Sequence, residues 1–370
     1  KTTDGNLILG RNFDFYAGDD FAKNKLISFV KPDNGIPFAS VSWGGMIGVV
    51  SAMNLNGLTV TLNAGKSDMP LVAKTPISLL AREIIQYAFT IEEAINIAKT
   101  RNVFVAESIM VGSATDNKAV LIEVSPNKFG VYDVANTNQL ICSNHFQSED
   151  YKEDENNMKH ILESHSKYRY DKMSQLIDST AVITPQVAVN ILRNKNGLQN
   201  KPIGFGNEKA LNQLLAHHGV VFKPSERQMW VSSNPYQLGE FVAYDLDDVF
   251  NGNFTKNTRF ENEELTISSD SFLESQEFID YEIYRIKDRE IDELLVNKNS
   301  IMHTEILEKY ISLNPNIWSV YFKVGKYYYQ KKMYTKAMLY FQAALDKEVT
   351  TVPDNEMIKK YLNKCQNKIN

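Results

Sequence analysis

The sequence predicts an α+β protein in which helices cover two β-sheets, followed by a helical extension. Three observations lead to this class. Short apolar runs separated by turn residues fill 1–145, and helix-type patterns fill 151–215. Strand-type runs then return before residue 250, and the pattern beyond it is helical again. We therefore expect a main domain at 1–250 and a helical extension at 251–370.

Turn signals locate the strands. Asn56-Gly57 favours a tight hairpin because both residues tolerate positive φ, and it separates the apolar runs 47–54 and 58–63. Asp4-Gly5 is a second signal of this kind. Further strands are expected at 107–112, 119–124, 130–134, 139–143, 218–222, 228–232 and 241–244.

Capping residues locate the helices. Thr75-Pro76 and Thr184-Pro185 each place a hydroxyl directly before a proline that can occupy the first helical position. Thr90-Ile91-Glu92-Glu93 matches a capping box and opens a helix that runs to about Lys99. A longer helix is expected at 157–177.

The C-terminal part combines a polar connector with pairs of helices. Residues 251–271 are polar, 271–296 have the pattern of a charged amphipathic helix, and a helix at 305–313 ends before Asn314-Pro315. Packing residues with the spacing of a tetratricopeptide repeat follow at Tyr321, Val324, Gly325, Tyr328, Ala337, Phe341 and Ala344. One to two such pairs cannot form a solenoid alone, so the tail should pack on the main domain or form a homo-oligomer.

Composition argues against several classes of function. The net charge of -5 and the pI near 5.8 provide no basic stripe for nucleic acid. No apolar run reaches the ~18 residues of a membrane span. Cys142 and Cys365 are the only cysteines, too few for a disulfide framework, and no metal-ligand spacing is present. We expect neither cofactor nor metal, and the compartment stays open.

An arginine and an aspartate close the first apolar strand, in Gly10-Arg11-Asn12-Phe13-Asp14-Phe15. Burying such charges is unfavourable unless they are paired or used. Strand residues three apart face opposite sides, so both reach one site only if the chain bends between them. Arg11 would then hold a nucleophile or substrate carboxylate, and Asp14 would orient an amine that acts as base. The alternative is a structural ion pair at a strand end.

Two asparagines end apolar strands. Asn63 follows Leu62, and Asn144 follows the run Leu140–Cys142. A side-chain amide at such a position can donate to a developing oxyanion, which stabilises it by about 3 kcal/mol in favourable cases. The alternative is that both are turn residues.

The histidines and the inner cysteine are less specific. His145 has no second ligand at metal spacing, which favours a pocket or core histidine. His217-His218 should point apart if both lie on a strand, which argues against a shared metal. Cys142 lies in an apolar run and is interpreted as a buried small hydrophobe.

The ordered set of motifs resembles the acyl-coenzyme A:6-aminopenicillanic acid acyltransferase-like family of N-terminal-nucleophile (Ntn) hydrolases, related to choloylglycine hydrolase and acid ceramidase. It covers about residues 1–246 in the family's order. The matching segments are Gly10–Phe15, Asn56-Gly57-Leu58 with Leu62-Asn63, Ala119–Pro126, Ser143-Asn144-His145-Phe146, Ser166 with Arg169, Met229–Ser232 and Gly239-Glu240-Phe241.

The resemblance implies a four-layer αββα sandwich and an N-terminal cysteine, exposed by self-cleavage or by removal of preceding residues. The thiol attacks a linear amide, the α-amine takes the proton, and water or an amine accepts the acyl group. This cysteine is expected several residues before Lys1, so the printed chain should lack it. The substrate would be a small-molecule amide or acyl donor. The alternative is an inactive scaffold that binds a partner or oligomerises through its tail.

The resemblance also implies roles for individual residues. Arg11 and Asp14 would flank and orient the cysteine, while Asn63 and Asn144 would form the oxyanion hole and position the amine. An arginine late in the domain completes the relatives' sites, and Arg227 is the nearest candidate. The residues expected to line the substrate pocket are Trp43, His145 and Phe146.

Overall fold

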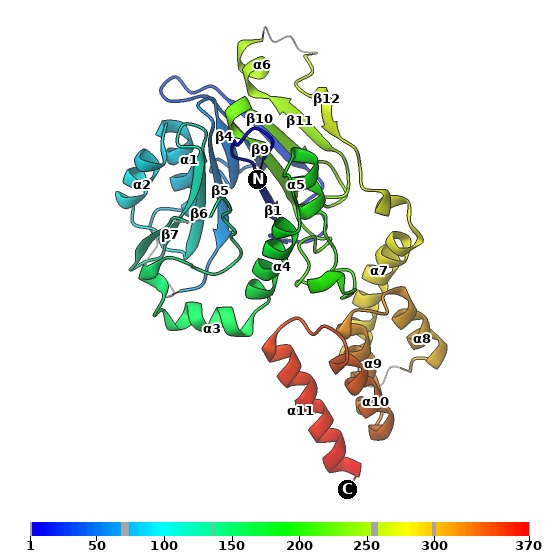
Figure 1. The fold of residues 1–370 in the computed structure, drawn as a ribbon. Coiled ribbons are helices and arrows are strands. Elements are labelled where there is room, and N and C mark those ends of the chain that lie inside the picture. Colours follow the sequence, from blue (N-terminus) through cyan, green and yellow to red (C-terminus); the bar gives the residue numbers. More distant parts are fainter. Residues whose placement is uncertain (1, 68–73, 135–136, 253–257, 298–300, 370) are drawn as a thin grey trace.

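The protein is described by a computed structural model. The structure describes residues 2–67, 74–134, 137–252, 258–297 and 301–369. Two antiparallel sheets lie face to face, and a group of helices extends from one end of them (Figure 1). This arrangement confirms the predicted α+β class.

The larger sheet has seven strands in chain order. Its strands are β2 (Lys25–Val30), β3 (Phe38–Trp43), β4 (Ser51–Asn54), β5 (Leu58–Ala64), β6 (Glu107–Ser113), β7 (Lys118–Val124) and β8 (Phe129–Tyr132). The predicted turn at Asn56-Gly57 joins β4 to β5, with Gly57 at φ +72°. Asn54 Oδ1 closes it by accepting from the backbone N–H groups of Asn56 and Leu58, each at 3.0 Å.

The smaller sheet brings the two ends of the main domain together. In order across the sheet, its strands are β1 (Leu9–Phe13), β9 (His218–Lys223), β10 (Gln228–Ser232), β11 (Phe241–Asp245) and β12 (Asn262–Ile267). β1 pairs with β9 from Leu9↔Phe222 to Phe13↔His218. Within the described residues, the other edge of β1 has no strand partner.

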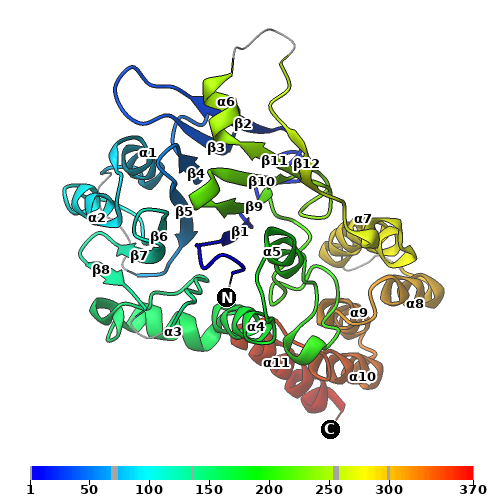
Figure 2. The ribbon, with the colours of Figure 1, turned by 45° about the horizontal axis from the view of Figure 1, so that its top comes forward.

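Alternating side chains build four layers, as the resemblance implies. Val220 and Phe222 of β9 pack between the two sheets, whereas Val221 packs beneath α5 (Pro185–Leu192). On the far side, α1 (Ile77–Tyr87) and α2 (Ile91–Lys99) cover the larger sheet. Figure 2 shows α1 and α2 on one side of the paired sheets and α5 on the other. Both faces of the inner strands β7, β9 and β10 are buried, so these strands consist mostly of apolar residues.

Two helix predictions need correction. The single helix expected at 157–177 is wrong, because α3 (Glu155–Glu163) and α4 (Ser166–Asp178) are separate. Ser164 breaks the run: its backbone is extended, with ψ 177°, and its hydroxyl accepts from the N–H of Ser166 at 3.1 Å. The first helix is preceded by Pro76 in the capping position, one residue later than expected.

Three strand-level predictions also differ. The strand expected at 139–143 does not form, because Leu140 and Cys142 satisfy their apolar character by packing against the core between the sheets. No hairpin forms at Asp4-Gly5. The polar connector 251–271 contains β12, an edge strand whose charged residues face solvent, as edge strands often do.

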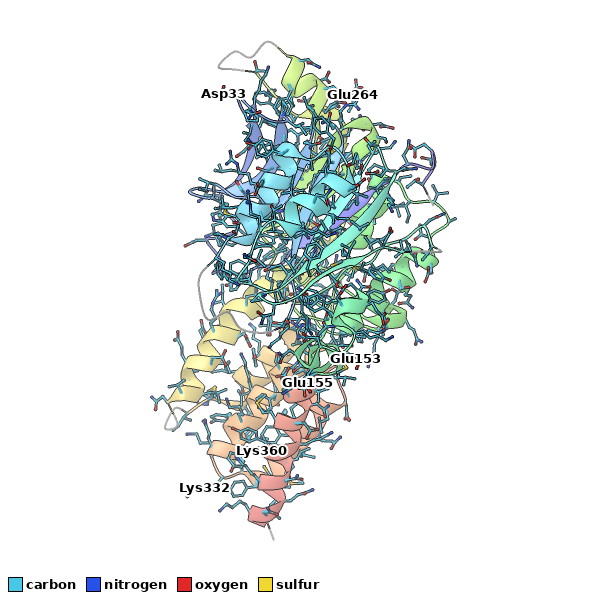
Figure 3. The ribbon with its side chains drawn as sticks, turned by 90° about the vertical axis from the view of Figure 1, so that its left-hand side faces the viewer. Asp33, Glu153, Glu155, Glu264, Lys332 and Lys360 are labelled. Atoms are coloured by element: carbon cyan, nitrogen blue, oxygen red, sulfur yellow. The ribbon has the colours of Figure 1, made fainter. Side chains whose placement is uncertain are left out.

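The C-terminal extension is helical, as predicted. Its helices are α7 (Gln276–Val296), α8 (Thr304–Leu313), α9 (Trp318–Gln330), α10 (Tyr334–Leu345) and α11 (Val352–Ile369). Leu214 and Leu238 of the main domain belong to the apolar core of the extension, so the tail packs on the main domain. Figure 3 shows the extension projecting from one end, with Lys332 and Lys360 far from Asp33 and Glu264. The tetratricopeptide-like arrangement and the homo-oligomer remain predictions.

Candidate active site

A large cavity of about 1610 Å³ follows β1. Every residue of β1 from Leu9 to Phe13 lines it, although alternate residues of a strand face opposite sides. The cavity therefore runs along the unpaired edge of the strand. Five of the predicted site residues line it: Arg11, Asp14, Trp43, Asn63 and Asn144.

Arg11 is buried and held by several acceptors. Its guanidinium donates to Ser51 Oγ at 2.5 Å, to the carbonyl of Val50 at 3.3 Å and to the carbonyl of Leu62. The Phe13 ring centroid lies 4.4 Å from Cζ. Burial lowers the pKa of Arg11 to about 10, against the opposing effect of Asp14 and other nearby groups. The group stays charged at neutral pH and places a fixed positive charge beside the cavity.

Asp14 carries an unused acceptor. Gln213 Nε2 donates to its Oδ2 at 3.2 Å, while Oδ1 is buried and has no hydrogen-bond partner in the described structure. Burial raises the pKa of Asp14 to about 6, although Arg169 and Arg11 act in the opposite direction. A buried carboxylate oxygen without a donor is destabilising, so this position is suited to an N–H group from a ligand or another segment.

The two asparagines meet at the end of β5. Asn63 is the penultimate residue of that strand and pairs with Ser108 of β6. Asn144 Nδ2 donates to the carbonyl of Ala64, the next residue, at 3.0 Å. Since a side-chain amide nitrogen carries two hydrogens, Asn144 keeps one further donor. Both amides line the cavity and have the chemistry of an oxyanion hole.

A network that the site predictions did not include holds Asn144 in place. Arg169 of α4 donates to Asn144 Oδ1, to the carbonyl of Glu208 at 2.8 Å and to His165 Nδ1 at 2.6 Å. An arginine can only donate, so neutral His165 carries its proton on Nε2, which lies 3.2 Å from Glu208 Oε2. The orientation of the Asn144 amide is thus fixed by Arg169.

Sequence reasoning missed Glu208 and Gln213, and it placed Arg169 in a matching motif without a role. The signal in the sequence was the position of Arg169 in the matching segment with Ser166. Its burial, which requires a partner for the cation, is known only from the structure. Glu208 and Gln213 lie in an irregular segment whose sequence has no periodicity. Arg227, the arginine suggested for the site, pairs with Asp247 at 2.7 Å and does not line the cavity.

Two predicted substrate-binding residues lie behind the cavity wall. His145 Nδ1 is 2.8 Å from Ser166 Oγ, and burial lowers the pKa of His145 to about 4. The Phe146 ring lies 4.1 Å from that of Tyr151 and against Gly65. Neither lines the cavity, whereas Trp43 does and stacks on Phe13. Direct contact of His145 and Phe146 with substrate stays a prediction. Their position behind the lining residues suits them to support the cavity wall.

The paired histidines support Arg11. His218 Nε2 lies 2.9 Å from Ser51 Oγ, the acceptor for Arg11, and His217 Nδ1 lies 2.8 Å from His218 Nδ1. Their rings therefore meet, contrary to prediction, because His217 precedes the strand and strand alternation does not apply. Burial lowers the pKa of both. Two neutral imidazoles can share one N–H across this contact.

Cys142 and Glu107 complete the cavity wall. Burial raises the pKa of the Cys142 thiol to about 12, so the thiolate that a nucleophile requires is scarce at neutral pH. Burial also raises the pKa of Glu107 to about 7. Among the described residues, no cluster of three or more potential metal ligands is found, and no helix is long and apolar enough to cross a membrane.

Two facing antiparallel sheets between layers of helices are the architecture of the Ntn hydrolases. The sequence model of the family acyl-coenzyme A:6-aminopenicillanic acid acyl-transferase matches residues 1–234. The chain belongs to this family, whose members are enzymes of the Ntn hydrolase and acyltransferase type.

The individual proteins that match this chain have low sequence identity to it or match only part of it. An uncharacterized protein from Archaeoglobus fulgidus is 31% identical over 134 residues, which are 35% of this chain and 22% of that protein. The chain thus spans about a fifth of that relative's length. The Caenorhabditis elegans ortholog of N-acylethanolamine-hydrolyzing acid amidase is 17% identical, with 61% of this chain and 91% of that chain covered and a TM-score of 0.43. A mutant conjugated bile acid hydrolase from Clostridium perfringens is 14% identical, with 70% and 95% covered and a TM-score of 0.44.

Proposed function

We propose that this chain forms the body of an amide hydrolase or acyltransferase that cleaves a linear amide C–N bond through an N-terminal cysteine. The observation that carries the proposal is the buried Oδ1 of Asp14, which has no partner among the described residues and lies just after β1, one edge of which pairs with no described strand. A free α-amine would supply the missing donor. A strand edge with unpaired N–H and C=O groups would accept the segment that bears this amine.

The residues then divide the reaction among them. The cysteine thiol attacks the amide carbonyl carbon while its own α-amine, oriented by Asp14, accepts the thiol proton. Asn63 and Asn144 donate to the oxyanion that forms. The C–N bond breaks, the amine leaves with that proton, and a thioester remains. Water or a second amine attacks the thioester and restores the thiol.

Arg11 would contribute charge rather than a proton. Its pKa of about 10 keeps it cationic, and its three acceptors fix its position. A fixed cation beside the site stabilises a developing thiolate and lowers the free energy of the attacking form.

N-terminal sequencing and intact-mass measurement on protein expressed from the complete gene test the proposal. A mature chain that begins with a cysteine before Lys1 supports it. A mature chain without a cysteine or another nucleophile at its first position contradicts it.

The alternative, an inactive scaffold that binds through its extension, has one observation in its favour. Ile279, Ile283 and Ile286 lie on one side of α7 and are 39–53% exposed. Light scattering on the full chain and on its Ile283→Glu variant tests this function. A mass that falls on substitution supports self-association through α7, and equal monomeric masses contradict it.

A further inference from the structure

The helical extension lies against one irregular segment of the main domain, residues 201–214. This segment supplies Glu208 and Gln213, the partners of Arg169, His165 and Asp14 in the cavity. The family match ends at residue 234, so the extension lies outside it. The segment 201–214 lies inside the matched region, so these contacts join the matched region to a part of the chain that the match does not cover.

Two glycines in the segment permit a close approach. Gly204 has φ +84°, and a Cβ atom there would lie 2.3 Å from the backbone nitrogen of Ile317, just before α9. Gly206 has φ +83°, and its Cβ would lie 3.2 Å from the hydroxyl oxygen and 3.3 Å from a ring carbon of Tyr281 in α7. Both the backbone conformation and the space favour glycine because the extension is packed there.

Buried hydrogen bonds then fix the segment from both sides. Asn314, only 1% exposed, donates to the carbonyl of Phe205 at 2.8 Å and accepts from its N–H at 3.1 Å. The carbonyl of Glu348 accepts from Asn207 Nδ2 at 2.9 Å. The Glu348 carboxylate pairs with Lys209 at 2.7 Å and with Lys201 at 3.2 Å.

Glu208 stands between two residues that Glu348 holds. Asn207 and Lys209 are its chain neighbours, so a shift of Glu348 would move the Glu208 backbone. That backbone carbonyl accepts from Arg169, which donates in turn to Asn144 Oδ1. The path from the extension to the oxyanion donor thus runs from Glu348 through Asn207 or Lys209 to Glu208, and from there through Arg169 to Asn144.

We propose that the extension is a positioning part of the active site, and that Asn314 and Glu348 set the Asn144 amide through Glu208 and Arg169. The inference rests on the proposed function. Glu348 and Asn314 are positioning residues, because neither lines the cavity. Small displacements of a catalytic group lower the rate strongly, so the extension affects turnover without touching substrate.

Kinetics and hydrogen exchange on the full-length protein test the inference, with Glu348→Gln and Asn314→Leu as variants. The control is Glu356→Gln, which removes an exposed carboxylate of α11 that pairs with Lys359. The substrate probe is a series of N-acyl aminomethylcoumarin amides of increasing acyl length. We expect kcat to fall about 10-fold in both variants with KM nearly unchanged, and faster exchange within 201–214. The control should match wild type in both measurements.

A double-mutant cycle separates positioning from general stability. If Glu348 acts through Arg169, then Glu348→Gln should lower kcat in the wild-type background and have no further effect in the Arg169→Met background. Independent, multiplying losses would overturn the inference, as would an unchanged kcat in Glu348→Gln. A wild-type protein with no turnover would instead overturn the proposed function.

Discussion

Gln213 donates to the carboxylate of Asp14 although 199 residues separate them in the chain. Asp14 follows the first strand of the smaller sheet, and Gln213 precedes the second, β9. Because β1 and β9 are neighbours, the pairing of the sheet itself brings the two side chains together. The other oxygen of Asp14 is buried and has no hydrogen-bond partner among the described residues.

Asp14→Asn should abolish most of the activity of the cysteine-bearing protein. The amide keeps the shape but loses the charge that orients the α-amine, so we expect kcat to fall at least ~100-fold. Steady-state kinetics on the coumarin amides measures this change. Asp33→Asn, an exposed change far from the cavity, is the control, and equal kcat values in the two variants would refute the assignment.

Asn144→Ala and Arg169→Met should lower the same rate. Removal of an oxyanion donor reduces kcat ~100-fold or more, and loss of Arg169 frees the amide that it orients. KM should change little, because the oxyanion exists only after attack. Arg227→Met is the matched control for the arginine, since Arg227 pairs with Asp247 outside the cavity. A rise in KM at constant kcat would indicate a binding role instead.

Gly204→Ala should destabilise the contact between the extension and the main domain. The added Cβ would meet the backbone of Ile317 at 2.3 Å. Gly18→Ala is the control, because Gly18 also has positive φ, +97°, but has open space around it. We expect the free energy of unfolding to fall by about 2 kcal/mol more at Gly204 than at Gly18. Denaturant unfolding measures both free energies. Equal losses of stability in the two variants would show that the contact with Ile317 has no effect.

Glu107→Gln should stabilise the protein at high pH only. Burial raises the pKa of Glu107 to about 7 in the fold, from an ordinary value of 4.5. The folded protein then keeps a proton that the unfolded chain has lost, so stability falls as pH rises from about 4.5 to 7. Glutamine removes this penalty. We expect the variant to gain about 1 kcal/mol at pH 8 and little at pH 4, measured by thermal unfolding. A gain at both pH values would contradict this cause.

Local signals in the sequence were sufficient for much of the fold. The Asn56-Gly57 turn, the Thr184 cap and the apolar strands report directly on backbone geometry and burial, and the structure confirms them. The segment 139–143 shows the limit of this reasoning. Its apolar residues indicate that the segment is buried. A segment can pack against the core without pairing with another strand. Ser164 likewise ended a helix whose hydrophobic pattern continued across it.

Residues of the candidate site could be predicted where they belong to a sequence motif. Residues that only the tertiary fold places beside the cavity could not. Arg11, Asp14, Asn63 and Asn144 end regular strands or apolar runs, and all four line one cavity. Glu208 and Gln213 stand in an irregular segment that long-range contacts, including contacts with the extension, hold in place. The meeting of His217 with His218 also required the three-dimensional path, because His217 precedes the strand and its side-chain direction is not set by strand alternation.

Trapping the acyl-enzyme tests the central claim most directly. Protein from the complete gene would be mixed with the coumarin amides, quenched in acid and measured by intact-mass and peptide-mapping mass spectrometry. The account predicts a mass increase equal to one acyl group, attached to the N-terminal cysteine through a bond that hydroxylamine cleaves. It also predicts that Asp14→Asn reduces the rate of labelling. Turnover without any covalent adduct on the first residue, or an adduct on Cys142, would contradict the mechanism.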